Sequence, residues 1–189
     1  MTERVSNDCV PRALGYRWPA EWERHAATWV SWPHNPETWP GNFEVVPGRF
    51  AVLVRTIARF EPVIMLANDA DLAGAQALCG PSVAVQAAPI DDGWFRDNGP
   101  SFVIDGRGNM KAVNWDFNGW GRKPGDPFAR DRAVTRVILE REGIARVAAP
   151  LILEGGSFHV DGEGTLITTR QCLLNPNRNP ACSQAVIER

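Results

Sequence analysis

The sequence predicts an α/β fold assembled from repeated modules, each made of a strand, a strand, a helix and a strand. The first observation is an internal repeat: residues 99–108 and 155–164 share six of ten positions, 56 residues apart. The second is that helix-like apolar spacing alternates with short strand-like runs from about residue 49 onward. A fixed period of this length indicates a modular architecture. Because 189 residues hold little more than three such modules, we expect the C-terminal modules to be missing from this chain.

The composition is that of a globular protein, with 44% hydrophobic and 22% charged residues. A net charge of −2 provides no basic surface, so we expect neither nucleic acid nor an acidic membrane as partner. The N-terminus lacks the apolar core of a signal peptide, and no apolar run approaches a membrane span. The scattered cysteines Cys9, Cys79, Cys172 and Cys182 are interpreted as reduced thiols. These features favour a cytoplasmic location.

Residues 1–48 form an N-terminal segment that is rich in Trp and Pro and shows little periodicity. We expect it to be an irregular cap over a core or the lining of a cleft. A helix is then predicted from Arg49 to the stop at Pro62. Its apolar stripe consists of Phe50, Leu53, Val54, Ile57 and Phe60.

The next elements are predicted to be short and buried. Residues 63–67 form an apolar run of strand length. Asn68 or Asp69 can cap the helix that follows, and Gly80 ends it. Residues 83–85 are predicted to be another strand.

The first repeat copy predicts a β-hairpin from residues 101–104 and 110–115, because turn residues separate the two runs. The Gly- and Asn-rich loop over 116–127 is long for a compact domain, and its start suggests a cleft loop or simple packing of the connection. The elements expected after it are a helix around residues 134–138 ended by Gly143, strands 145–148 and 151–153, a second hairpin over 157–169, and the first turns of a helix over 183–189.

Only the second repeat copy carries a histidine, since His159 stands where the first copy has Val103. The scaffold therefore does not need a polar group there, which points to chemistry. His159 and Asp161 share a face of a strand, and a histidine beside a carboxylate can act as acid and then base near neutral pH. The alternative for His159 is a core histidine. For Asp161 it is a turn residue, because Asp105 has the same place in the first copy.

Asp97 is predicted on a loop that enters the first hairpin, three residues after Trp94. An indole face next to a carboxylate suits a flat cation, which stacks on one and bonds to the other. The alternative is a turn-forming aspartate paired with Arg96. In the second copy, Gly155 and Gly156 let the backbone approach a ligand closely or adopt positive φ.

Other candidates have weaker patterns. A metal-dependent hydrolase would use His25, His34 and His159, but no ligand-type spacing supports it, and we expect no metal. Asp91 and Asp92 suit either a cation site or a solvated loop.

Neither Cys172 nor Cys182 has a nearby base or a glycine-rich turn in the sequence. An activated cysteine nucleophile needs such a setting, so neither is interpreted as one.

The motifs around these residues resemble the agmatine deiminases, within the Porphyromonas-type peptidylarginine deiminases. The similar segments are residues 19–29, 32–34, 91–100, 115–118, 154–164 and 172–180. The resemblance implies a pentein fold, an α/β propeller of five ββαβ modules around a pseudo-fivefold axis. Residues 1–189 would then form one pentein-like domain that is incomplete in this chain.

The resemblance also implies a reaction, in which agmatine and water give N-carbamoylputrescine and ammonia, without metal or organic cofactor. This places the protein in putrescine biosynthesis and polyamine metabolism. It implies that Asp97 and Asp161 bind the guanidinium, that Trp94 lies against its plane, and that the Gly155 backbone is close. A cysteine thiolate would attack the central carbon. His159 would protonate the departing ammonia and then deprotonate the hydrolytic water.

The family's nucleophilic cysteine lies in a Gly-x-x-His-Cys segment near the C-terminus, and these 189 residues contain no such segment. We therefore expect this chain to be inactive alone. Two alternatives remain: a deiminase of peptidyl-arginine or arginine, and a non-catalytic remnant that binds guanidino compounds. An incomplete ring would leave strand edges and apolar faces open, so we expect association or poor solubility when the chain is expressed alone, and a homo-oligomer as the assembled state.

Overall fold

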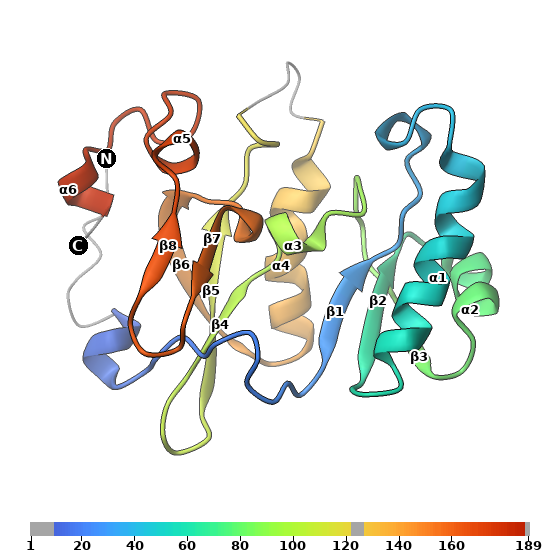
Figure 1. The fold of residues 1–189 in the computed structure, drawn as a ribbon, viewed down its shortest axis with the longest axis horizontal. Coiled ribbons are helices and arrows are strands. Elements are labelled where there is room, and N and C mark those ends of the chain that lie inside the picture. The colour runs from blue at the N-terminus through green and yellow to red at the C-terminus, as the bar shows by residue number, and fades with distance from the viewer. Residues whose placement is uncertain (1–9, 122–126, 188–189) are drawn as a thin grey trace. The chain divides into compact units, whose positions relative to one another are not determined.

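The computed structural model describes residues 10–121 and 127–187, and these divide into two compact units (Figure 1). The parallel-sheet unit consists of residues 24–96 and 127–134, and the hairpin unit consists of residues 10–23, 97–121 and 135–187. Cys9 and the middle of the predicted 116–127 loop lie outside the described residues. The assignment of 1–189 to one incomplete pentein-like domain stays a prediction.

The parallel-sheet unit contains three strands in the order β1 (Thr28–Ser31), β2 (Val63–Ala67) and β3 (Val83–Ala87), all parallel. The strand predicted over 63–67 is confirmed and forms the centre of this sheet. Helices α1 (Val46–Ile57) and α2 (Leu72–Cys79) make the connections that parallel neighbours require (Figure 1). The carboxyl ends of the three strands consequently meet at one edge.

The core of this unit joins the sheet to its two helices. Its fully or nearly fully buried members are Trp32, Ala51, Val54, Val63, Met65, Ala67, Ala75, Cys79 and Val83. Burial of these apolar side chains is the main driving force for the unit.

The helix predicted from Arg49 is confirmed as α1, but it begins at Val46, where Pro47 suits the first turn. Its predicted apolar stripe is too wide. Leu53 is 51% exposed, and Phe60 lies beyond the end of the helix at 81% exposure. The fully buried face consists of Ala51 and Val54, while Phe50 and Ile57 of the predicted stripe are partly buried against the same core.

The predicted N-cap of the second helix, Asn68 or Asp69, is wrong. Helix α2 begins after Asp71, whose side chain makes no cap hydrogen bond, while Gly80 ends the helix as predicted. Asn68 instead bonds both backbone groups of Ile90. Its side-chain amide donates to the Ile90 carbonyl (3.1 Å) and accepts from the Ile90 N–H (3.0 Å). Asn68 thereby ties the end of β2 to the segment that enters Asp91.

Helix α4 (Ala129–Arg141) begins with a capping box made by two distant parts of the chain. The Asp91 carboxylate accepts from the N–H groups of Arg130 (2.8 Å) and Asp131 (3.3 Å). In return, the Asp131 carboxylate accepts from the Asp91 N–H at 2.9 Å. Asp91 is therefore a helix cap, neither a cation ligand nor part of a solvated loop.

The hairpin unit confirms the predicted order of strand, strand, helix and strand. Strands β4 (Ser101–Ile104) and β5 (Met110–Asp116) are antiparallel, and β6 (Ala145–Ile152) returns parallel to β5 (Figure 1). The expectation of two strands over 145–148 and 151–153 is wrong. One strand continues through Pro150, because β6 lies at the edge of its sheet in the described part of the chain, and its register with β5 shifts in this region.

The second repeat copy forms the predicted hairpin, with β7 (Phe158–Val160) antiparallel to β8 (Leu166–Thr168). Two short helices follow, α5 (Arg170–Leu173) and α6 (Gln184–Ile187). The predicted first turns of a helix near the end of the chain are thus confirmed within the described residues.

The N-terminal segment is mostly irregular, as predicted, with short 3-10 turns η2 (Pro11–Leu14), η3 (Pro36–Thr38) and η4 (Phe43–Val45). The exception is β1, which was not predicted. Only one of its four residues is fully buried, so its sequence shows no alternation of apolar and polar residues. Within the hairpin unit, Trp18 stacks on Trp115 and meets Phe158 edge-on.

Cys79, Cys172 and Cys182 are free thiols. Among the helices that the structure describes, none is long and apolar enough to cross a membrane.

Because the capping box buries the carboxyl group of Asp131, we expect the free energy of unfolding to depend on pH. Asp131 is fully buried, and burial together with the carboxylates of Asp91 and Asp92 raises its pKa from 3.8 to about 7. The folded state therefore holds a proton that the unfolded state loses above pH 4. We expect the free energy of unfolding to fall by up to about 4 kcal/mol between pH 4 and pH 7 from this group.

Asp131→Asn keeps the oxygen acceptor and removes the ionisation, so its unfolding free energy should vary less over this pH range. Urea denaturation at a series of pH values measures this, with exposed Asp69→Asn as the control that keeps the wild-type dependence. Identical pH profiles for wild type and Asp131→Asn would contradict the prediction.

Candidate active site

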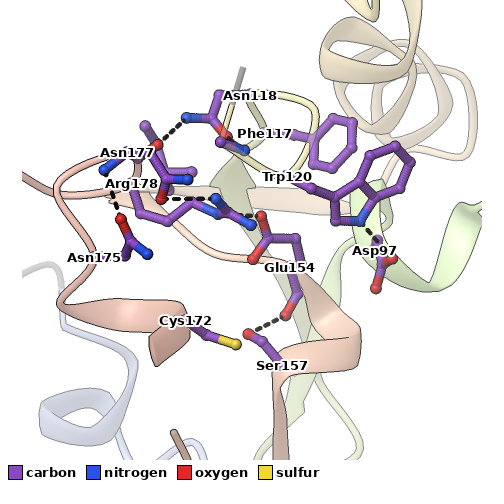
Figure 2. A network of polar contacts seen from close by, with 12 residues as sticks. Asp97, Phe117, Asn118, Trp120, Glu154, Ser157, Cys172, Asn175, Asn177 and Arg178 are labelled. Atoms are coloured by element: carbon purple, nitrogen blue, oxygen red, sulfur yellow. Dashed lines mark hydrogen bonds and ion pairs between the residues drawn. The ribbon is translucent and has the colours of Figure 1, made fainter. Parts of the chain in front are cut away.

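Asp97 is the sequence-predicted site residue with the most defined surroundings. It lies in the one-turn helix α3 (Phe95–Asn98), and not on the loop that was predicted, directly before β4. Figure 2 shows Trp120 directed at its carboxylate; the Trp120 indole N–H donates to Oδ2 at 2.9 Å. The Gly156 N–H donates to Oδ1 at 2.9 Å. Each carboxylate oxygen therefore has one protein donor and can accept another hydrogen bond.

The glycine pair of the second copy forms the 3-10 turn η5 (Gly155–Ser157). Neither Gly155 nor Gly156 has positive φ, so the turn does not need glycine for a left-handed backbone conformation. Gly155 is buried, and Gly156 supplies the N–H that reaches Asp97. Ser157 closes the turn by donating to the Glu154 carbonyl from its N–H (2.9 Å) and its hydroxyl (2.7 Å).

A buried ion pair lies beside this turn. Arg178 Nε is 2.6 Å from Glu154 Oε1, and the two side chains are only 11% and 4% exposed. Arg178 also donates to the Asn177 side-chain oxygen (2.9 Å) (Figure 2). Asn179 bonds both backbone groups of Ile152 at 3.0 Å. The loop over 175–179 therefore fixes the chain that leads from β6 into the glycine turn.

Trp120 belongs to the loop after β5, and sequence reasoning did not assign it a role. Its only signal was the unusual Trp- and Gly-containing stretch over 115–121. Trp120 has φ 56°, and its ring meets Phe117 edge-on at 5.2 Å. Asn118, 6% exposed, donates to the Asn177 carbonyl (2.8 Å) and accepts from the Gly121 N–H (2.9 Å).

His159 lies in β7 with its side chain 70% exposed, which excludes the core-histidine alternative. Its Nδ1 is 3.8 Å from the carboxylate of Glu21, a residue that sequence reasoning missed. The N-terminal segment brings Glu21 there because Ala20 packs closely on Gly162 in the hairpin turn, where an added Cβ would lie 2.8 Å from the Ala20 nitrogen.

Asp161 follows β7 and shapes the hairpin turn. Its Oδ1 accepts from the N–H groups of Glu163 (2.8 Å) and Thr165 (3.0 Å). Hydrogen bonds from Thr165 and the turn backbone lower its pKa. In the first copy, Asp105 accepts from two turn N–H groups at 2.8 and 2.9 Å in the same way. The turn role is thus present in both copies. In the described part of the chain, no hydrogen bond joins Asp97, His159 and Asp161 to one another.

Trp94 belongs to the parallel-sheet unit, where it is 40% exposed and stacks on Trp39 at a centroid distance of 5.8 Å. Asp92 nearby in sequence is 3% exposed, so the solvated-loop expectation is wrong for it. Its carboxylate accepts hydrogen bonds from the Gly93 N–H (2.7 Å) and from the Thr38 hydroxyl.

The remaining histidines and cysteines have structural surroundings. His25 pairs with Glu61 at 3.1 Å, and His34 contacts the Trp32 carbonyl at 3.1 Å. The Cys172 N–H donates to the Thr169 hydroxyl that caps α5. Over residues 10–121 and 127–187, no group of three or more His, Cys, Asp or Glu side chains is arranged to hold a metal ion.

A carboxylate held by two N–H donors, with a free acceptor site on each oxygen, suits a planar cation with several N–H groups. Residues 17–189 match the family model of the Porphyromonas-type peptidyl-arginine deiminases, and the chain belongs to this family. It is similar to the agmatine deiminase of Pseudomonas aeruginosa (strain LESB58), with 50% identity over 185 residues, which are 95% of this chain and 50% of the relative.

Two solved structures show the same fold. The agmatine deiminase of Enterococcus faecalis, described as catalysing its reaction, has a TM-score of 0.90 and 34% identity, covering 99% of this chain and 52% of that one. A C. jejuni agmatine deiminase, a cysteine-to-serine variant with substrate bound, has a TM-score of 0.80 and 27% identity, covering 91% and 51%. The predicted pentein-type α/β fold is confirmed, and the chain spans about half the length of these relatives.

Removing one partner of the buried Arg178–Glu154 ion pair should strongly lower the free energy of unfolding. Arg178→Met leaves the Glu154 carboxylate buried without its counterion, and we expect a loss of about 3–5 kcal/mol in unfolding free energy. Glu154→Gln together with Arg178→Met should lose less, because no uncompensated charge remains. Urea denaturation measures both.

The exposed Arg136–Glu140 pair provides a control, since Arg136→Ala should change stability by less than about 0.5 kcal/mol. An Arg178→Met variant as stable as this control would contradict the prediction.

Proposed function

We propose that the protein to which these residues belong hydrolyses the guanidino group of agmatine, giving N-carbamoylputrescine and ammonia. The observation that carries the proposal is the Asp97 carboxylate, which two donors hold at 2.9 Å while both oxygens keep an acceptor site. A guanidinium presents parallel N–H groups that match two such oxygens. Membership of the deiminase family and similarity to agmatine deiminases support this substrate.

Asp161 is proposed as the second carboxylate for the guanidinium. Its Oδ1 accepts from the N–H groups of Glu163 and Thr165, and these bonds hold the carboxylate at the hairpin turn. The proposal for Asp161 rests on the family resemblance and on its position two residues after His159. Trp94 is proposed to lie against the guanidinium plane and the Gly155 backbone beside it, as the family resemblance implies.

His159 is proposed as the acid and base of the reaction, and its exposed ring is open to a ligand. A cysteine thiolate attacks the guanidinium carbon and forms a C–S bond. His159 donates a proton to the nitrogen that leaves as ammonia, and the C–N bond breaks. Water then attacks the amidino intermediate, His159 takes its proton, and the C–S bond breaks to free the thiolate.

The thiolate of this scheme is not assigned to any cysteine of the 189 residues, since none lies in a Gly-x-x-His-Cys segment. Binding of guanidino compounds without turnover would use the same carboxylates. Deimination of arginine or peptidyl-arginine would use the same guanidinium contacts. We further propose a cytoplasmic homo-oligomer that acts in putrescine biosynthesis and requires no cofactor.

The first test is agmatine binding and turnover by the purified 189-residue chain. We expect agmatine to bind, as measured by titration calorimetry, and no ammonia release. Asp97→Asn should weaken binding by about 10- to 100-fold, since a charge-assisted contact is lost. Agmatine hydrolysis by this chain would show that one of its own cysteines can act as the nucleophile. If the chain does not bind agmatine, the proposed function is wrong.

Asp161 and Asp105 offer a matched pair, because each makes the same turn in its copy of the repeat. We expect Asp161→Asn and Asp105→Asn to destabilise the chain to a similar extent. Only Asp161→Asn should weaken agmatine binding, by about tenfold. Equal binding by the two variants would leave Asp161 with a turn role alone.

A further inference from the structure

Both oxygens of Asp97 are fixed, and the two donors come from different loops. Oδ1 is bonded to the Gly156 N–H and Oδ2 to the Trp120 indole N–H, each at 2.9 Å. A carboxylate with one such bond can still rotate about its terminal torsion, whereas two bonds fix its plane. The plane matters because a bidentate contact with a guanidinium requires the two oxygens in line with two N–H groups.

Trp120 is itself held in an unusual conformation. Its φ of 56° lies in the left-handed region, and its neighbours Gly119 (φ 65°) and Gly121 (φ 104°) share that region. A bulky residue stays there only where its surroundings determine the conformation. Phe117 and Asn118 supply this: Phe117 packs edge-on against the indole, and Asn118 bonds the Gly121 N–H.

The same loop over 175–179 supports both donors of Asp97 (Figure 2). On one side, the Asn177 carbonyl accepts from Asn118, which shapes the turn that carries Trp120. On the other side, Arg178 pairs with Glu154, the residue before the glycine turn. The 175–179 loop packs tightly on the turn that carries Trp120, because a Cβ added to Gly121 would lie 2.2 Å from Arg178 Nη1.

We propose that Trp120 is a positioning residue, which sets the plane of the Asp97 carboxylate for guanidinium binding. Trp120 is itself held through Asn118, which bonds the Asn177 carbonyl of the 175–179 loop. The inference rests on the proposed function, since it gives Asp97 the guanidinium as its ligand. Trp120 acts through Asp97 and contributes no contact of its own to the reacting atoms.

Trp120→Phe tests the proposal, because it removes the N–H donor and keeps a ring against Phe117. Trp115→Phe is the matched control: it also removes an indole hydrogen bond, to the Ser101 hydroxyl at 2.9 Å, in the same unit. In the 189-residue chain, Trp120→Phe should weaken agmatine binding by about tenfold or more, and Trp115→Phe by less than about twofold. Equal effects of the two variants would overturn the proposal.

A double-mutant cycle with Asp97→Asn separates positioning from direct contact. If Trp120 acts through Asp97, Trp120→Phe causes no further loss of binding in the Asp97→Asn background. Additive losses would mean that the indole contributes independently, and would overturn the positioning role.

A second readout needs no substrate. In the nuclear magnetic resonance spectrum, Asp97→Asn should shift the indole N–H signal of Trp120 more than that of Trp115. If wild type binds no agmatine, the proposed function fails, and this shift still shows whether Trp120 holds Asp97. An unchanged Trp120 signal would overturn the inference whatever the binding result.

Discussion

The candidate site depends on the buried pair of Arg178 and Glu154. Removing two charges from water is costly, and the pair recovers this cost only with good geometry and further hydrogen bonds. The 2.6 Å contact and the bond from Arg178 to Asn177 meet that requirement. Because Glu154 leads directly into the glycine turn, the ion pair holds the residue that precedes the Gly156 N–H. A contact that stabilises the fold therefore also supports a donor to Asp97.

Both hairpins of the hairpin unit could be predicted because the same ten-residue pattern occurs twice in the sequence. The hairpins, the intervening helix and the glycine stop at Gly143 follow from turn residues and apolar spacing, which are local signals. Strand β1 and the unbroken β6 escaped prediction, since both depend on a neighbouring strand. The edge position of β6 tolerates Pro150, and no local pattern reveals which strand is at an edge.

The sequence selected candidate site residues, but not the contacts that surround them. Asp97, His159 and Asp161 stood out through the repeat and the family resemblance. The donors to Asp97 did not, because Gly156 acts through its backbone and Trp120 is separated from Asp97 by 23 residues. Glu21 near His159 and Arg178 near Glu154 are likewise brought together only by tertiary folding. Polar pairs formed at long range leave no periodic trace in a sequence.

The capping box of α4 has a consequence for how the chain folds. Most helices begin with a cap supplied by the residue just before the first turn, so they can start forming alone. Here the cap is Asp91, about 40 residues earlier, and the reciprocal bond returns from Asp131. The bonds from Arg130 and Asp131 to Asp91 form when the segment that carries Asp91 reaches the helix, and closing a loop of this length costs entropy. The start of α4 and the position of Asp91 are therefore coupled, and each helps to fix the other.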